Sequence, residues 1–224
     1  MIIYHIFFDL GYLGYMPGIL GNWTLTIIGR SAFVIFLVVC GVSLSLSRSR
    51  IVSQGQKLLF IKYLKRGFFI FFLGLLITLA TKIYIGQGYV IFGILHLIGL
   101  SVIISYPFLK FTFINIIIGA VFLIFGFFLL TFSFHIPWFL WLGFKPEGFY
   151  TLDYFPVFPY FGFVLIGIGA GNILYKNFRR RFSLPDHAKF LLIKAIEFLG
   201  RNSLYIYLVH QPVIIGVIMI LNYV

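Results

Sequence analysis

The side chains best suited to proton transfer lie in the most apolar parts of the chain. His5 and Asp9 are spaced i, i+4, so a helix would place them on one face. A carboxylate beside an imidazole fixes the tautomer of the ring and favours its protonated form, as for a general base and its orienting group. The alternative is structural: the two side chains bond neighbouring helices separately, and Asp9 faces Arg30.

Two more histidines lie inside apolar runs, His96 in FGILHLIGL and His210, followed by Gln211, in SLYIYLVHQPV. Ionisable groups within a membrane are costly and are therefore candidates for function, although each could instead be an interhelical hydrogen-bonding residue. Histidines across a bundle could also hold haem or a metal. The Glu-x-x-His, His-x-x-x-His and Cys-x-x-Cys spacings are missing, so no metal site is expected.

The composition determines which elements must position these groups. Apolar residues make up 62% of the 224 residues, charged residues only 10%, and the mean hydropathy is +1.09. A soluble domain is roughly 45–50% apolar and about 25% charged. The apolar runs are long and continuous, whereas strands of a membrane barrel would alternate apolar and polar residues. The sequence therefore predicts an all-α, polytopic transmembrane helical bundle.

About seven spans are expected, because each needs about 20 residues. We treat residues 1–224 as a single domain, since no repeat or low-complexity linker divides them. Within GIGAG, Gly167 and Gly171 form a small-xxx-small pair that favours close helix packing. The predicted spans cover roughly residues 1–16, 27–47, 67–85, 89–108, 112–132, 155–175 and 203–222.

The net charge of +12 is explained by membrane topology rather than by nucleic-acid binding. Alternating spans leave only Arg30, Lys82 and Lys145 on one side. The positive-inside rule then places the N-terminus in the cytoplasm and the C-terminus outside a multi-pass protein of the plasma membrane. The cytoplasmic side would hold the other basic residues: Arg48, Arg50, Lys57, Lys62, Lys65, Arg66, Lys110, Lys176, Arg179, Arg180, Arg181, Lys189, Lys194 and Arg201.

The chain resembles membrane acyltransferases related to heparan-alpha-glucosaminide N-acetyltransferase, and the wider group includes the acyltransferase-3 family. The resemblance covers nearly the whole chain, and its most specific elements are the first-helix His5 and the closing GRNSLYIYLVHQPV. It also includes, in order, MIIYHIFFDLGYLGY, FVIFLVVCGVSLSLS, KYLKRGFFIFFLGLLITLAT, VIFGILHLIGL and TLDYFPVFPYFGFVLIGIGAGNILY. Relatives carry an acidic residue and an Arg-Gly pair about ten residues before this His. The chain starts at Met1 without them, so either the start is truncated or misassigned, or the chain is a short variant.

The resemblance implies transfer of an acetyl or other acyl group from acyl-CoA to a sugar or glycolipid. His5 would be the base or the acyl carrier and Asp9 its orienting group. Oxyanion donors would come from His96, Asn202, Ser203 and His210, with Gln211 adjacent. Arg66 and Arg201 stand at helix starts that favour the phosphates of CoA. Arg30 and Asp153, at external helix starts, could hold the acceptor.

Two other functions fit the same residues. A transporter would use the intramembrane His and Asp side chains as a proton relay. A non-catalytic membrane scaffold would need them only for packing. The expected partners are membrane lipids, acyl-CoA and the acceptor, with no nucleic acid, and the oligomeric state stays open, a homodimer included.

Overall fold

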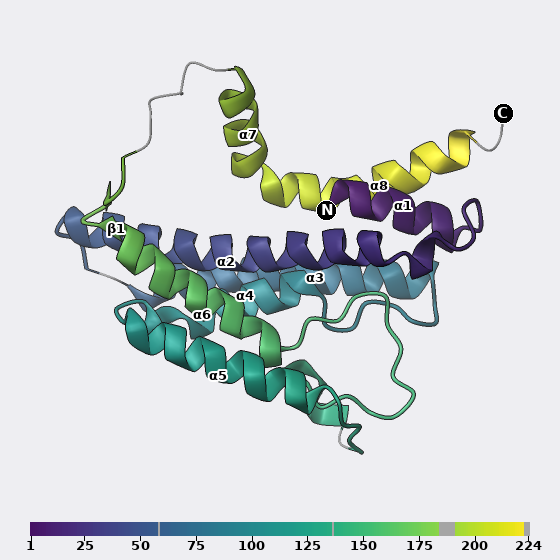
Figure 1. Cartoon of the computed structure of the whole chain (residues 1–224), viewed down its shortest axis with the longest axis horizontal. Helices are drawn as coiled ribbons and strands as arrows, with labels where there is room; N and C mark the ends of the chain where they lie inside the picture. Colours follow the sequence, from purple (N-terminus) through teal and green to yellow (C-terminus); the bar gives the residue numbers. More distant parts are fainter. Residues whose placement is uncertain (58, 136, 184–190, 222–224) are drawn as a thin grey trace. The chain divides into compact units, whose positions relative to one another are not determined.

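In a computed structural model of the protein, residues 1–57, 59–135, 137–183 and 191–221 are described (Figure 1). They form two compact units. The first contains Met1–Val34 and Ser183–Val224, and the second contains Ile35–Phe182. The division falls within a single long helix, α2 (Trp23–Ser53).

The first unit is built from α1 (Ile2–Tyr12), the short 3-10 helix η1 (Ile19–Gly21), the start of α2, α7 (Leu191–Arg201) and α8 (Ser203–Leu221). Asn22 caps α2, because its side-chain oxygen accepts the Thr24 N–H at 2.9 Å. The ring of Tyr4 on α1 covers Gly29 of α2, where a Cβ would meet the ring at 2.7 Å. This close approach holds the first helix against the beginning of α2.

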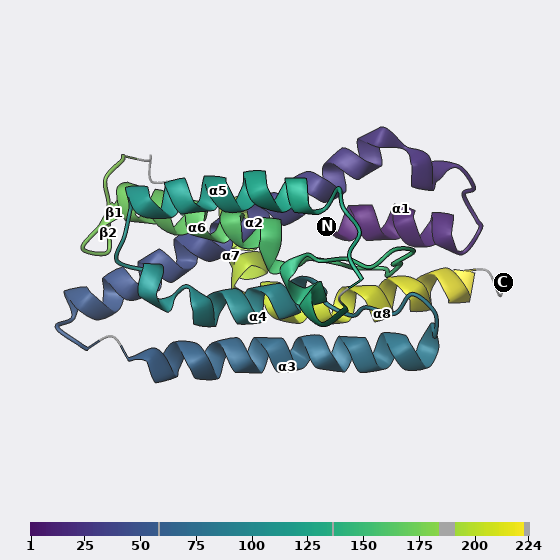
Figure 2. The same cartoon turned by 90° about the horizontal axis from the view of Figure 1, so that it is seen from below.

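The second unit contains the rest of α2 with α3 (Phe60–Tyr84), α4 (Ile94–Ile104), α5 (Phe113–Leu129) and α6 (Val157–Leu174). Helices α3 and α4 run side by side, as do α5 and α6 (Figures 1 and 2). Two 3-10 helices, η2 (Tyr106–Phe108) and η3 (Pro137–Leu142), lie in the connections. After α6, the strands β1 (Tyr175–Lys176) and β2 (Arg179–Arg180) form a short antiparallel hairpin.

Glycines allow the helices of the second unit to approach closely. A Cβ at Gly167 of α6 would lie 2.2 Å from the Val38 carbonyl oxygen of α2, and one at Gly41 would lie 2.1 Å from the Val164 carbonyl oxygen. Gly171 packs against Ser45 in the same way. The predicted small-xxx-small contact is therefore confirmed, with α2 as the partner helix.

The predicted all-α bundle is confirmed, and each of the seven predicted spans corresponds to an apolar helix. Among the described residues, α2, α3, α6 and α8 are long and apolar enough to cross a membrane, while α1, α4 and α5 are shorter. The Gly93 N-cap and the Pro107-containing η2 confine the predicted span 89–108 to the 11 residues of α4. Lys189 and residue 222, where the last predicted span ends, lie outside the described residues.

Helix α7 was not predicted from the sequence. Helix α7 occupies part of the stretch expected to be a basic loop, and it ends next to the start of α8. Its charged residues Lys194, Glu197 and Arg201 are spaced three and four apart, so they lie on one face, and apolar residues occupy most of the rest. The charges that suggested a loop are therefore the polar face of an amphipathic helix.

Candidate functional site

The contact between α1 and α8 in the first unit brings together four of the predicted site residues. His5 and Asp9, one turn apart on α1, both contact α8. The rings of His5 and His210 have centroids 4.9 Å apart and are inclined by 59°. Gln211, the next residue on α8, reaches Asp9. The first and last apolar helices of the chain therefore supply one polar cluster.

Asp9 is bonded to Gln211. The side chain of Asp9 is buried, with 4% exposure, and the Gln211 Nε2 donates to its two carboxylate oxygens at 2.8 and 2.9 Å. A carboxylate only accepts hydrogen bonds, so this contact orients the Gln211 amide with its NH₂ toward Asp9. The sequence left open whether Asp9 pairs with His5 or faces Arg30. In the structure its hydrogen-bond donor is a third residue, Gln211.

Three buried polar atoms of the cluster have no hydrogen-bond partner among the described residues: His5 Nδ1, His210 Nε2 and Gln211 Oε1. Buried polar atoms normally have a partner, since each one left without costs about 1–3 kcal/mol. A cluster of such atoms between two apolar helices is a candidate site, where a polar ligand or an ordered water would supply the missing bonds.

The tautomer of His210 follows from its neighbour. His210 Nδ1 lies 2.6 Å from the backbone carbonyl oxygen of Tyr207, one turn earlier on α8. A carbonyl only accepts, so Nδ1 carries the hydrogen, and whenever the ring is neutral its lone pair is on Nε2. That lone pair belongs to one of the unpartnered atoms. His210 therefore has a free basic nitrogen beside the ring of His5.

His96 and Asp153 lie together elsewhere, in the second unit, at the N-terminus of α4. The Gly93 N–H donates to His96 Nδ1 at 3.2 Å, and His96 Nε2 lies 3.5 Å from the Thr78 hydroxyl. Asp153 Oδ2 accepts the Ile94 N–H at 3.2 Å. Both side chains thus bond the backbone N–H groups that a helix start leaves free.

The environment of Asp153 favours its neutral form. Asp153 lies in the connection before α6, outside the helices long enough to span a membrane. Burial raises the pKa of its carboxyl from 3.8 to about 6, and the hydrogen bond from the Ile94 N–H opposes that rise. The Asp153 carboxyl, which lies at the start of α4, therefore changes its charge near pH 6.

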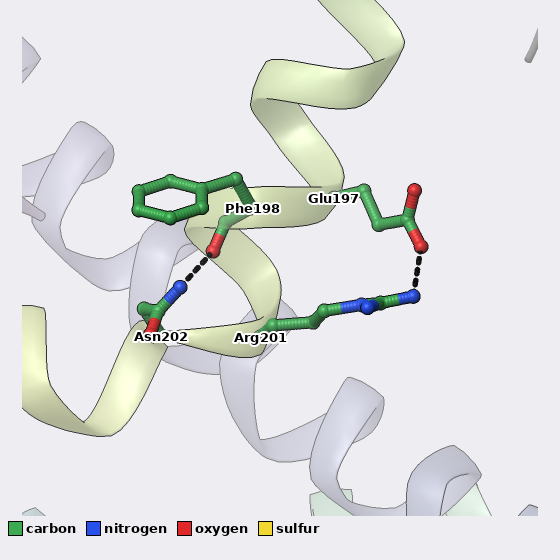
Figure 3. A network of polar contacts seen from close by, with 4 residues as sticks. All are labelled: Glu197, Phe198, Arg201 and Asn202. Carbon is green, nitrogen blue, oxygen red and sulfur yellow. Dashed lines mark hydrogen bonds and ion pairs between the residues drawn. The ribbon is translucent and has the colours of Figure 1, made fainter.

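Arg201, Asn202 and Ser203 mark the junction of α7 and α8, where the two helices run in different directions (Figure 3). Arg201 forms an ion pair with Glu197, and both side chains are largely exposed. The Asn202 amide donates to the Phe198 carbonyl oxygen at 2.9 Å, which caps the end of α7. Both contacts therefore lie at the end of α7. Arg201 is the last residue of that helix and does not stand at a helix start as predicted, whereas Ser203 begins α8.

The remaining two predicted site residues are exposed cations. Arg30 is the eighth residue of α2, in the first unit, and Arg66 is the seventh residue of α3, in the second. The prediction that they stand at helix starts is therefore wrong, because both helices begin about two turns before these residues. Within the described residues, no group of three or more His, Cys, Asp or Glu side chains is placed to hold a metal ion. The α1–α8 cluster is therefore the candidate site, formed by His5, Asp9, His210 and Gln211.

These helices define a polytopic α-helical membrane protein, and the buried polar cluster between α1 and α8 is its candidate site. Residues 1–212 match the family described as heparan-alpha-glucosaminide N-acetyltransferase, catalytic, and the chain belongs to that family of membrane acyltransferases. No curated protein matches the chain. No solved structure matches it either.

Sequence reasoning named the four cluster residues but not their pairing. It missed the Tyr207 carbonyl, which holds the ring of His210. The spacing of three residues between Tyr207 and His210 could have indicated it, since side chains can bond backbone groups one turn away. The contacts of His5 with His210 and of Asp9 with Gln211 join opposite ends of the chain and have no such local signal.

Proposed function

We propose that this protein transfers an acetyl or other acyl group from acyl-CoA to a hydroxyl or amine of a sugar or glycolipid. The observation that carries the proposal is the set of three buried, unpartnered polar atoms at the α1–α8 contact. Two of them are imidazole nitrogens, the groups that most often move protons at neutral pH. Membership of the acyltransferase family supplies the reaction class.

In the first form of the reaction, an imidazole is a general base. It takes the proton from the acceptor O–H or N–H as the acceptor oxygen or nitrogen bonds to the thioester carbonyl carbon. The carbon–sulfur bond then breaks, and the proton passes from the imidazolium to the departing CoA sulfur. His210 Nε2 has the free lone pair for this step, and His5 is the other candidate.

In the second form, His5 is the acyl carrier. A ring nitrogen attacks the thioester carbon, the carbon–sulfur bond breaks, and the CoA thiol leaves with the proton of the ring. The acceptor then attacks the acyl-imidazole and loses its proton to His210 Nε2. The bond between the acyl carbon and the His5 nitrogen breaks, and the proton passes from the His210 imidazolium to that nitrogen, which restores both rings. The ring centroids of His5 and His210 are 4.9 Å apart, which is close enough for one ring to carry the acyl group while the other accepts the proton of the acceptor.

Gln211 and Asp9 have supporting roles in either form. Because the Gln211 NH₂ is bonded to Asp9, its unpartnered Oε1 is available to accept a hydrogen bond from the acceptor. Asp9 is therefore a positioning residue that acts through Gln211. Arg66 and Arg201 are proposed to attract the phosphates of the donor, and Arg30 the acceptor. His96 and Asp153 position α4, while Asn202 and Ser203 position the start of α8.

The topology belongs to the same proposal. With the basic connections in the cytoplasm, the N-terminus is cytoplasmic and the C-terminus external, in the plasma membrane. The chain contains a single cysteine, Cys40, so a Cys40→Ala background allows single-cysteine labelling. Ser53→Cys should react with an impermeant maleimide only after cell lysis, and Glu147→Cys in intact cells. The reverse pattern would overturn this orientation.

The activity is tested with the purified protein in nanodiscs and radiolabelled acetyl-CoA, with amino sugars and glycolipids as acceptors. We expect label on the acceptor, lost in His5→Ala and retained in His135→Ala, which removes an exposed histidine from a connection. Label retained on the protein without acceptor, and lost in His5→Ala, would identify the carrier form. Absence of label with several acyl-CoA donors, or proton-coupled solute flux dependent on His5 in proteoliposomes, would contradict acyl transfer.

A further inference from the structure

A compact cluster of cations at the end of α6 is the strongest feature that the proposed reaction does not use. A surface hollow of about 510 Å³ lies between the β1–β2 hairpin and the end of α2, wholly within the second unit. Four of its six lining residues are cationic: Lys176, Arg179, Arg180 and Arg181. The other two are Ser53 and Asn177.

The hairpin is held in place by its turn. Asn177 and Phe178 both have positive φ, 51° and 61°, as a tight two-residue hairpin requires. The Phe178 N–H donates to the Ser49 hydroxyl of α2 at 2.7 Å, and the Arg50 guanidinium lies 6.0 Å from the centre of the Phe178 ring. The cations that flank the turn are therefore presented by a structured element.

The pairing of the strands concentrates like charge. Lys176 stands directly opposite Arg179 in the antiparallel register, and Tyr175 stands opposite Arg180. Like charges directly opposite one another destabilise a strand pair. Among the described residues, the one ion pair is that of Arg201 with Glu197, in the other unit, so no described carboxylate offsets the charge of the hairpin.

One of the four cations, Arg181, stabilises the end of α6. The Arg181 N–H donates to the Leu174 carbonyl oxygen at 2.9 Å, and its guanidinium donates to the Ile173 carbonyl oxygen at 3.4 Å. These carbonyls belong to the last turn of α6, where a cation is favourable. Lys176, Arg179 and Arg180 make no such side-chain bond to the part of the chain that the structure describes, and they are exposed around the hollow.

We infer that the hollow between the β1–β2 hairpin and α2 is a phosphate-binding site, with Lys176, Arg179 and Arg180 as its cations. Guanidinium groups bind phosphate oxygens with strong, charge-assisted hydrogen bonds, and an anion there would relieve the repulsion between Lys176 and Arg179. The phosphate could belong to a soluble molecule such as CoA or to the headgroup of an anionic lipid. The inference concerns binding alone and does not depend on acyl transfer.

The test compares the double variant Arg179→Gln/Arg180→Gln with Lys57→Gln/Lys62→Gln. The control removes two exposed cations from the predicted cytoplasmic side, outside the hollow, and so has the same net charge. Calorimetry in neutral detergent measures the affinity for CoA and pyrophosphate. Native mass spectrometry measures retention of phosphatidylglycerol against phosphatidylcholine. Thermal unfolding checks that both variants keep the fold.

At least one ligand should bind the hairpin variant about tenfold more weakly than it binds the control, since a charge-assisted bond contributes about 1.5 kcal/mol or more. Loss of CoA and pyrophosphate binding identifies a soluble ligand, and selective loss of phosphatidylglycerol identifies a lipid. Equal binding by the two variants, or no binding of any probe by the unaltered protein, would overturn the inference.

Discussion

The side-chain amide of Gln211 donates to both carboxylate oxygens of Asp9, at 2.8 and 2.9 Å, and so joins the first and last apolar helices of the chain. Asp9 is buried, so removal of Gln211 leaves its carboxylate without this donor. Hydrogen bonds to charged groups contribute about 1.5–3 kcal/mol, although those between membrane helices average nearer 0.6 kcal/mol.

We therefore predict a coupling energy of about 1.5 kcal/mol between Asp9→Ala and Gln211→Ala in a double-mutant cycle. The measurement is unfolding of the four proteins in mixed micelles with increasing denaturing detergent. The pair of Asp9→Ala with Gly216→Ala is the control, because Gly216 also lies on α8 but has nothing near its side-chain position. Additive effects for Asp9 and Gln211 would show that the bond does not hold α1 to α8.

A second prediction distinguishes the catalytic role of His210 from that of His5. If His210 Nε2 is the proton acceptor, His210→Gln should lower kcat by about a hundredfold or more, the usual range for a general base, with little change in KM for acyl-CoA. His5→Gln should abolish labelling of the protein in the carrier form, whereas His210→Gln should leave that labelling in place. A kcat for His210→Gln within a few-fold of the unaltered enzyme would remove His210 from the chemistry.

The sequence predicted the bundle because membrane helices are encoded locally, in runs of apolar residues. It misplaced the ends of α2 and α3, because cations do not end a helix. Helix α2 continues through Arg48 and Arg50 to Ser53, and α3 already begins at Phe60. Helix α7 was missed since its 11 residues are too few for a span and their charges suggested a loop.

The candidate site was predictable as a set of residue types but not as an arrangement. An ionisable residue in an apolar run is visible in the sequence, and His5, Asp9, His96 and His210 were found in that way. Which of them meet depends on helix packing over almost the full length of the chain. His96 had the same sequence signal as His210, yet its nitrogens face Gly93, the N-cap of α4, and Thr78 of α3.

A third prediction concerns the contact between α2 and α6. A Cβ at Gly167 would lie 2.2 Å from a backbone carbonyl oxygen, which cannot move aside as a side chain could. Gly167→Ala should therefore destabilise the protein by about 1–3 kcal/mol or more. Gly216→Ala meets nothing within 4 Å and should stabilise α8 by about 1 kcal/mol through helix propensity. Equal melting temperatures in detergent for the two variants would contradict the close packing.

The last prediction follows from the position of Asp153 at the start of α4. Burial raises the pKa of its carboxyl from 3.8 to about 6, so the folded protein binds the proton more tightly than the unfolded chain does. The full contribution of this group to the free energy of unfolding is present below about pH 4. It is lost as the pH rises through about 6, by at most about 3 kcal/mol.

The variant Asp153→Asn keeps an oxygen to accept the Ile94 N–H but cannot ionise. The difference in unfolding free energy between the variant and the unaltered protein, measured in detergent from pH 4.5 to 7.5, should therefore grow in favour of the variant as the pH rises. Parallel pH profiles would mean that Asp153 ionises as readily in the folded protein as in the unfolded chain. Its hydrogen bond to the Ile94 N–H would then be that of a solvent-exposed helix cap.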